Sequence, residues 1–464
     1  MHAPSSPALS THPLVVESNP QLLRTLVWLS LPVMLEHVLH MLVGLTDTYL
    51  ANQLPAQHAP ATAAVGTIGY IIWFMGLLVG TVAMGSSALI ARGTGARHRT
   101  LVNSVVGQSM SAAVILGIAL GIGMWVFAPS IVSITQLSTD AQGFALSYLR
   151  MLAWSMPFVL PMFVANACLR GAGDTLSPAV AMITVDVVNI VFTFGLTRGL
   201  FGLPMMGFNG IAAGTLIAYI VGGLLQFAVL ISGRRGVRLH LHRLRPHWIT
   251  LKRIFRIGLP SGLEGLISWV ANFAVVLVIN RVDATDRMAA AHINAVRIEG
   301  LSYMLGFAVA MAVSTMVGQS LGMRDPKRAT RSAYLGFAFG GSMMTLMGAL
   351  FVLFPHRFAG IMSNDATIEA MTANCLHITG FIQCGFAAAI IFGGALRGAG
   401  DTAGAMRSTI TSLLLVRLPG VLIVGLWLNR GLGAIWIVLA GELFFRGVLI
   451  FARFARGRWR DVVV

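Results

Sequence analysis

Six acidic residues lie inside long apolar stretches of the 464-residue sequence, where a charge is costly. An ionised carboxylate at the centre of a bilayer costs roughly 2.5–3.5 kcal/mol on insertion scales. Such a group persists when it faces a cavity, pairs with a cation or stays protonated. The six carboxylates, each of which must meet one of these conditions, are Glu36, Asp47, Asp186, Glu264, Glu299 and Glu442.

The apolar stretch at 25–50 carries three ionisable side chains on one face of the expected helix. His40 follows Glu36 by four residues, and Asp47 follows His40 by seven. At about 100° per residue, these spacings align the three groups along one stripe. We expect this stripe to face the interior, with Thr46 offering a hydroxyl beside Asp47. The pattern predicts an ion-coupling role for Glu36 and Asp47 and a substrate or gating role for His40; buried hydrogen-bonded struts are the alternative.

A second polar face lies in the apolar stretch at 176–199. Asp186, Asn189 and Thr193 are spaced by three and four residues, which places them on one side of a helix. We expect Asn189 to stand opposite Asp47, while Asp186 either forms the other wall or pairs with loop arginines. Oxygens of Asp47, Asn189 and Thr193 would suit Na⁺, whereas a buried carboxylate that prefers its neutral form would suit a proton. Of the two coupling ions, H⁺ is our preferred prediction.

The second half of the chain has its own charged groups within apolar stretches. Glu264, Arg297 and Glu299 are candidates for substrate binding or gating. Arg297 and Glu299 are two residues apart and cannot share a helix face, so we expect Arg297 to pair with Glu264 across helices. Glu442 and Arg446 have the favourable i,i+4 order and are predicted to form a structural pair.

The composition identifies a membrane protein. Hydrophobic residues make up 56% of the chain and charged residues only 10%, whereas soluble domains carry about 25% charged residues. Membrane-spanning helices need about 20 mostly apolar residues. The net charge of +16 does not indicate nucleic-acid binding, because the basic residues separate apolar stretches and form no recognition motif.

Twelve apolar stretches are long enough to cross a bilayer. In a membrane, backbone groups must be hydrogen-bonded within the protein, so these stretches are predicted to be helices and the fold all-α. They occupy 25–50, 62–90, 102–127, 143–166, 176–199, 210–232, 256–280, 289–317, 332–354, 367–394, 405–428 and 432–453.

The sequence is an internal duplication. The heptapeptide LRGAGDT occurs at 169–175 and again at 396–402, and LPVMLE at 31–36 returns as LPSGLE at 259–264. Gly95 is matched in the same way by Gly322. Because each half contains six spans, both halves enter the membrane in the same direction, and we expect them to be related by a pseudo-two-fold axis along the membrane normal.

Basic residues set the expected orientation. Most of the 32 Lys and Arg residues fall on one side when both termini are placed in the cytoplasm, as the positive-inside rule requires. The sequence then divides into five parts. These are a disordered tail (1–20), an N-lobe (21–232), a basic cytoplasmic linker (233–254), a C-lobe (255–455) and a basic C-terminal tail (456–464).

The paired LRGAGDT and LPxxLE motifs resemble those of the multidrug and toxic compound extrusion (MATE) transporters. LTDTYLA at 45–51, VDVVNIVF at 185–192 and INAVRIEGLSYMLGF at 293–307 are also similar to that family, most of all to its DinF-like branch. Ser268 and Phe386 stand where the NorM-like branch has acidic residues, which implies that the C-lobe sodium site of that branch is absent. Thr193 replaces an aspartate that some relatives carry four residues after the asparagine at 189.

The resemblance implies a secondary transporter that is not an enzyme and needs no cofactor. Its expected activity is multidrug efflux, in which bulky organic and often cationic compounds leave the cell in exchange for H⁺ or Na⁺. Expected partners are small organic molecules and the lipid bilayer of the plasma membrane, with no nucleic acid and a monomeric state. The alternative is a lipid-linked precursor flippase of the wider superfamily.

Overall fold

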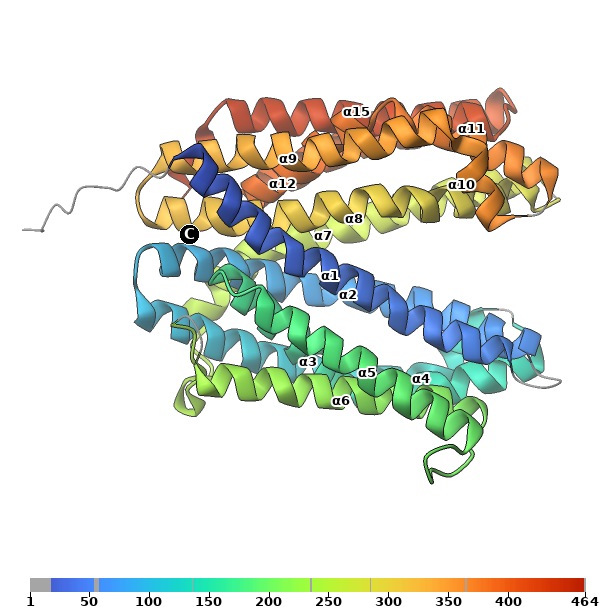
Figure 1. Cartoon of the computed structure of the whole chain (residues 1–464), viewed down its shortest axis with the longest axis horizontal. Helices are drawn as coiled ribbons and strands as arrows, with labels where there is room; N and C mark the ends of the chain where they lie inside the picture. Colours follow the sequence, from blue (N-terminus) through green and yellow to red (C-terminus); the bar gives the residue numbers. More distant parts are fainter. Residues whose placement is uncertain are drawn as a thin grey trace, which may run out of the picture.

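The computed structural model describes residues 18–53, 58–135, 137–233, 236–283, 285–363 and 365–462, and these are almost entirely helical (Figure 1). The first half contains six long helices. They are α1 (Asn19–Asn52), α2 (His58–Gly95), α3 (Arg99–Ile134), α4 (Thr139–Gly171), α5 (Leu176–Arg198) and α6 (Phe208–Ser232).

The second half repeats this order with two irregular spans. Its elements are α7 (Trp248–Val282), α8 (Arg287–Gly322), α9 (Pro326–Leu353), the short α10 (Pro355–Met362), α11 (Ala366–Gly380), α12 (Gln383–Gly398), α13 (Thr402–Ser412) and α15 (Leu432–Ala455). Between α13 and α15, two π-helical turns, Leu413–Arg417 and Ile423–Trp427, flank α14 (Leu418–Leu422).

Every predicted apolar stretch coincides with helix. Among the described residues, ten helices are long and apolar enough to cross a membrane, and the α11–α12 pair adds an eleventh. The remaining stretch, 62–90, lies in α2. The predicted N-terminal tail lies outside the described residues except at its end, where α1 already begins at Asn19.

One predicted span is not straight. The stretch at 367–394 is divided into α11 and α12, which meet at an angle of 62°. Polar side chains occupy the bend: the amide of Gln383 donates to the backbone oxygen of Thr379 (3.4 Å) and accepts from Ser302 on α8 (2.7 Å). The bend therefore brings the ends of both short helices to the interior of the second half.

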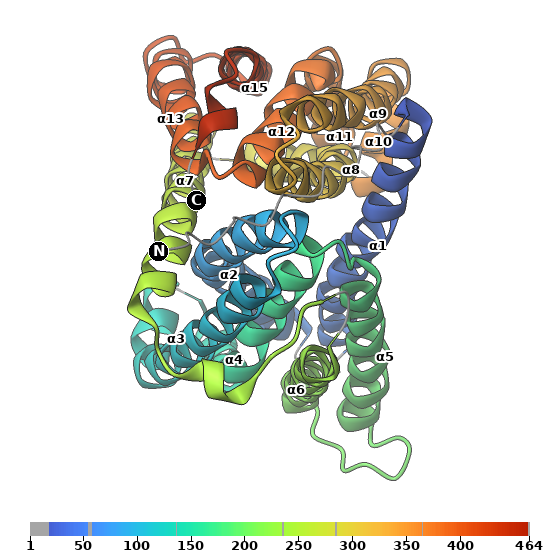
Figure 2. The ribbon, with the colours of Figure 1, turned by 90° about the vertical axis from the view of Figure 1, so that its left-hand side faces the viewer.

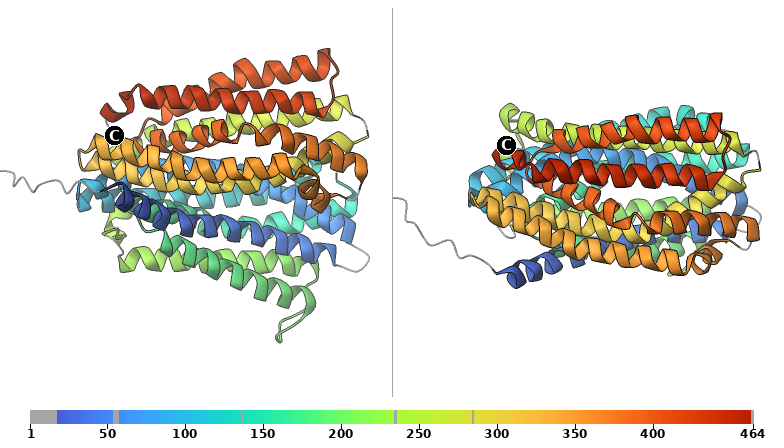
Figure 3. Two further views of the ribbon diagram at one scale, coloured as in Figure 1. Left: turned by 45° about the horizontal axis from the view of Figure 1, so that its top comes forward. Right: turned by 90° about the horizontal axis from the view of Figure 1, so that it is seen from above.

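The two halves form two lobes of six spans each, related by a pseudo-two-fold axis, as the duplication predicted. The lobes are stacked in Figure 1, and their helices run in roughly the same direction when viewed from above (Figure 3). Separate clusters of buried hydrophobic residues, aliphatic and aromatic, hold each lobe together. The expected all-α, two-lobe membrane fold is confirmed.

The first helix of each half packs on both lobes. Leu22 and Leu26 at the start of α1 belong to the core of the C-lobe, whereas Leu50 belongs to that of the N-lobe. The start of α7 does the reverse, because Ile254 and Ile257 are buried in the N-lobe core. An end-on view shows α1 on one flank of the molecule and α7 on the other (Figure 2).

The segment between the lobes runs along α3. Buried Gln108 donates to the backbone oxygens of Arg243 and Arg245 (2.7 Å each) and accepts from the amide of His247 (2.7 Å). These bonds satisfy a stretch that contains only a short 3₁₀ turn, Leu241–Leu244. The helix α7 then begins at Trp248, within the range assigned to the linker from sequence.

The C-terminal ends of α2 and α8 cross in backbone contact. A Cβ atom on Gly95 would lie 2.0 Å from the backbone oxygen of Gln319, and one on Gly322 would lie 2.2 Å from that of Arg92. These contacts are reciprocal, because Gly95 matches Gly322 in the repeat and Arg92 matches Gln319. Only glycine allows such an approach, so the repeated glycines close the two lobes against each other at this end.

The same crossing holds both LRGAGDT turns. Arg92 donates to the backbone oxygen of Ala399 (2.8 Å) in the second turn, and Gln319 donates to that of Gly171 (3.2 Å) in the first. The hydroxyl of Thr315 adds a bond to the backbone oxygen of Arg170 (3.0 Å). Each lobe therefore contacts the repeated turn of the other.

We predict that Gly95→Ala prevents full closure of the lobes at the α2–α8 crossing, because the added methyl group overlaps a backbone atom that cannot rotate away. Spin labels at Thr100→Cys on α3 and Lys327→Cys on α9, in a Cys384→Ser background, should report a longer and broader distance distribution. Gly76→Ala on the same helix is the matched control, since its Cβ would meet nothing within 4 Å. An unchanged distance in Gly95→Ala would show that this crossing does not set the closed state.

Candidate cation site and gate

Asp47 lies buried in the N-lobe with hydroxyl donors but no basic partner. The hydroxyl of Tyr148 on α4 donates to Oδ2 (2.6 Å), and that of Thr215 on α6 donates to the same oxygen (2.9 Å). The residue is 3% exposed. None of the ion pairs formed by the described residues includes Asp47, so the site leaves one negative charge without compensation when this carboxylate is ionised.

Two buried oxygens on α5 have no hydrogen-bond partner. Asn189 donates through Nδ2 to the hydroxyl of Thr215 (3.0 Å), which places it beside Asp47 as the sequence predicted. Its Oδ1 atom and the hydroxyl of Thr193 are buried and have no hydrogen-bond partner. Buried polar atoms normally have a hydrogen-bond partner. These two oxygens could therefore serve as ligands of a bound cation or accept a hydrogen bond from a protonated group.

Asp186 is a second unpaired carboxylate on α5. It is 4% exposed, and both of its oxygens are buried without a partner. Tyr219 on α6 lies near enough to both Asp186 and Asp47 to be affected by the charge of each. An ionised carboxylate with no donor at all is strongly unfavourable in a low-dielectric interior, which favours the neutral acid at Asp186.

Unlike Asp47 and Asp186, the glutamates of the two LPxxLE motifs form ion pairs with arginines. Arg170 from the first LRGAGDT motif pairs with Glu36 (2.7 Å), and Arg397 from the second pairs with Glu264 (3.2 Å). The predicted pairing of Arg297 with Glu264 is wrong, because the repeated motifs supply the partners instead. Glu36 lies on the same helix as Asp47 but belongs to this ion pair.

Arg297 on α8 is exposed. It precedes Thr315 on α8 by a whole number of helical turns, at about 3.6 residues per turn. Thr315 contacts the N-lobe, so Arg297 lies on the same face of α8, several turns farther along it. Glu299, two residues later, faces into the C-lobe, where the hydroxyl of Thr379 donates to it.

Glu442 forms the structural pair predicted with Arg446, and a further partner joins it. Arg446 binds the fully buried Glu442 through a salt bridge of 2.7 Å, and Arg417 binds it at 2.7 Å from the π-helical turn. Arg417 also reaches Asn272 on α7 (2.5 Å). The wide turn at Leu413–Arg417 carries this arginine into the C-lobe, which apolar periodicity did not predict.

The six carboxylates of the spans therefore fall into two groups. Glu36, Glu264 and Glu442 have arginine partners from other helices or from the same helix. Asp47, Asp186 and Glu299 have none among the described residues. The side chain of His40 lies outside the described residues.

Sequence reasoning missed the donors to Asp47. It expected a hydroxyl of Thr46, on the same helix as Asp47, to lie beside this carboxylate. Tyr148 and Thr215 supply the donors from α4 and α6 instead. Tyr148 and Thr215 could have been noticed as polar residues inside otherwise apolar stretches. The sequence does not show which polar residues of other helices face Asp47.

A fold of two helical lobes around unpaired buried acids defines a membrane transporter. Residues 32–194 and 260–423 match the model of the MatE family, one match in each half. The chain belongs to this family, and the predicted resemblance to MATE transporters is confirmed. It is a secondary transporter and not an enzyme; the DinF-like branch stays a prediction.

Named relatives match the whole chain. A probable multidrug resistance protein NorM of Thermotoga maritima is 29% identical over 97% of this chain and 95% of its own length. The multidrug resistance protein PmpM of Pseudomonas aeruginosa is 26% identical over 95% of this chain and 92% of its own. A solved MOP superfamily transporter from Pyrococcus furiosus has the same fold, with a TM-score of 0.86, 23% identity and coverage of 96% of this chain and 99% of that one.

We predict that Glu36→Gln destabilises the protein, because it leaves the guanidinium of Arg170 unpaired. Removing one partner of a buried pair costs on the order of 3–5 kcal/mol. Thermal unfolding in detergent should show a clear drop in Tm. Glu369→Gln is the control, since Glu369 pairs with exposed His356 and a surface pair contributes about 0–1 kcal/mol. Equal melting curves for the two variants would contradict a structural role for the Glu36 pair.

Proposed function

We propose that this protein expels bulky organic, often cationic, compounds by antiport against an inward flow of cations. The observation that carries the proposal is the buried carboxylate of Asp47, which has hydroxyl and amide neighbours but no basic partner. The names of the relatives, which are multidrug resistance proteins, support the class of substrate.

In the proposed mechanism, a cation entering from outside neutralises Asp47. Tyr148, Thr215 and Asn189 hold the carboxylate in place, and the free oxygens of Asn189 and Thr193 complete the site. Because α1 packs on both lobes, a change in the conformation of its N-lobe half alters the contact between its other half and the C-lobe. Coupling then requires that the cation and the substrate bind the two states with different affinity.

Asp186 and the ion pairs have distinct parts in this proposal. Asp186 acts as the neutral acid of the N-lobe site, which favours H⁺ over Na⁺ as the coupling ion. Glu36 and Glu264, held by arginines of the LRGAGDT turns, belong to the gate rather than to the ion site. Glu299 is the acidic residue of the C-lobe that we propose for substrate binding or gating.

The substrate is proposed to bind between the lobes. Phe74 on α2 packs against Trp269 on α7 across the lobe boundary (5.6 Å between ring centres), and Trp269 stacks on Phe273 (5.6 Å). Aromatic faces attract organic cations. Arg297 lies on the face of α8 turned to the N-lobe. Its positive charge would repel the cationic part of a substrate and attract an acidic part.

The cellular setting follows from the same reasoning. We propose that the protein lies in the bacterial inner membrane with both termini in the cytoplasm, as its basic residues indicate. In that orientation, the α2–α8 crossing closes the cytoplasmic side. The duplicated chain contains both lobes, and a monomer is the proposed working unit.

We predict that Asp47→Asn abolishes cation-coupled export, because the amide can neither take up a proton nor neutralise Na⁺. Proteoliposomes should accumulate ethidium when a pH gradient is imposed on the wild type, with little response to a Na⁺ gradient. The variant should lose at least about 90% of this flux, as expected for a group needed in every cycle.

Asp140→Asn is the control, since Asp140 is an exposed acid at the start of α4. Full coupling in Asp47→Asn would overturn the role of Asp47. Absence of drug flux together with translocation of a fluorescent lipid precursor would favour the flippase alternative.

A further inference from the structure

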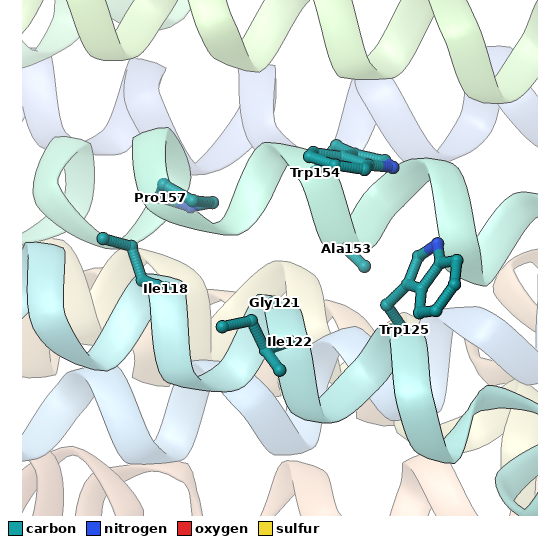
Figure 4. Close-up of a pocket in the computed structure, with 7 residues that line it drawn as sticks. All are labelled: Ile118, Gly121, Ile122, Trp125, Ala153, Trp154 and Pro157. Carbon is teal, nitrogen blue, oxygen red and sulfur yellow. The ribbon is translucent and has the colours of Figure 1, made fainter.

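An apolar groove lies between α3 and α4 on the outside of the N-lobe, away from the cation site. Its walls are Ile118, Ile122, Trp125 and Trp154, which are 46%, 61%, 47% and 67% exposed. Its remaining lining comes from Gly121, Ala153 and Pro157. Figure 4 shows both indole rings toward one end and Ile118 and Pro157 at the other.

Glycines let the two helices touch beneath this groove. A Cβ atom on Gly121 would lie 2.7 Å from the backbone oxygen of Ala153, and one on Gly117 would lie 2.7 Å from that of Met156. The bottom of the groove is therefore formed by backbone atoms, and the large side chains on both helices form its walls. The stretch from Ile118 to Trp125 covers two helical turns, roughly 10 Å along α3, which suits one stretch of hydrocarbon chain.

A single basic residue stands at the tryptophan end. The guanidinium of Arg150 lies over the ring of Trp125, 5.4 Å from its centre. Its Nε atom is buried and has no hydrogen-bond partner, and none of the ion pairs of the described residues includes it. By contrast, Arg417 and Arg446 in the spans of the C-lobe are both paired with Glu442.

The depth of Arg150 matches a lipid headgroup. The helix α4 begins at Thr139 and has 33 residues, whereas about 20 residues are enough to cross the hydrocarbon core. If α4 extends equally beyond both surfaces, the Cα atom of Arg150 lies between one and two helical turns inside the core. Its long side chain can then reach the phosphate level, as basic residues near helix ends do.

We propose that this groove is a binding site for an anionic phospholipid of the leaflet nearest the α3–α4 loop. One acyl chain lies between α3 and α4, and the phosphate binds the guanidinium of Arg150. An anionic headgroup fits better than a zwitterionic one, because Arg150 lacks a carboxylate partner and a zwitterionic headgroup brings its own cation. This site is independent of the proposed transport activity.

Native mass spectrometry of the intact protein in detergent tests the proposal with phosphatidylglycerol and phosphatidylethanolamine of identical chains. We expect phosphatidylglycerol to bind more tightly, and Arg150→Gln to weaken it about tenfold, as for the loss of a charge-assisted hydrogen bond. Ile118→Trp, which fills the groove and leaves the arginine intact, should also reduce binding. Arg357→Gln is the matched control, because Arg357 also lies over an aromatic ring, that of Phe354 (5.7 Å).

Several outcomes would overturn the site. Equal binding of both lipids would remove the anionic preference, and unchanged binding in Arg150→Gln would remove the phosphate contact. An equal loss in Arg357→Gln would show a general effect of net charge. Competition by soluble glycerol phosphate at the same concentration as the lipid would show a free-phosphate site in place of a lipid site.

Discussion

A carboxylate buried in the membrane without a basic partner is the constraint on which this structure depends. Hydrocarbon offers no solvent to stabilise Asp47, and the protein supplies only hydroxyl and amide groups around it. At Glu36, Glu264 and Glu442 the same fold provides an arginine that neutralises the charge of the carboxylate. An acid left unpaired in that setting has a net charge that a mobile cation can cancel.

The helix that carries this acid also connects the two lobes. Leu22 at the start of α1 is buried in the C-lobe, while Asp47 lies in the N-lobe, many turns farther along the helix. Pro32 and the Glu36–Arg170 pair lie between them, at the point where α1 passes from one lobe to the other. Proline interrupts the hydrogen-bond ladder and permits a bend. A bend of α1 at this point would let a change at Asp47 alter how the two lobes pack against each other, as the proposed coupling requires.

Duplication made much of this arrangement predictable. The repeats of LRGAGDT, LPxxLE and the Gly95 position predicted two lobes and a pseudo-two-fold axis, because each copy of a sequence repeat is expected to form a similar structural unit. Helical spacing also put Asp186, Asn189 and Thr193 on one face of α5, and the structure places Asn189 of that face beside Asp47. These inferences needed only periodicity and the cost of burying a charge.

Contacts between distant helices could not be obtained in the same way. Periodicity gives the face on which a side chain lies but not the helix opposite, so Arg297 was assigned to Glu264 where Arg397 is the partner. The bend at 381–382 and the π-helical turn that positions Arg417 were missed for a related reason. Both depend on tertiary polar contacts, while the local apolar pattern is that of a continuous helix.

The most direct test measures the separation of the lobes at the end opposite the α2–α8 crossing. Spin labels at Ser130→Cys on α3 and Ala366→Cys on α11, in a Cys384→Ser background, would report that distance while pH and Na⁺ are varied separately. The account predicts that lowering the pH shifts the distance distribution in the otherwise wild-type protein and leaves it fixed in Asp47→Asn. An identical pH response in the two proteins would contradict the claim that cation binding at Asp47 sets the relation of the lobes.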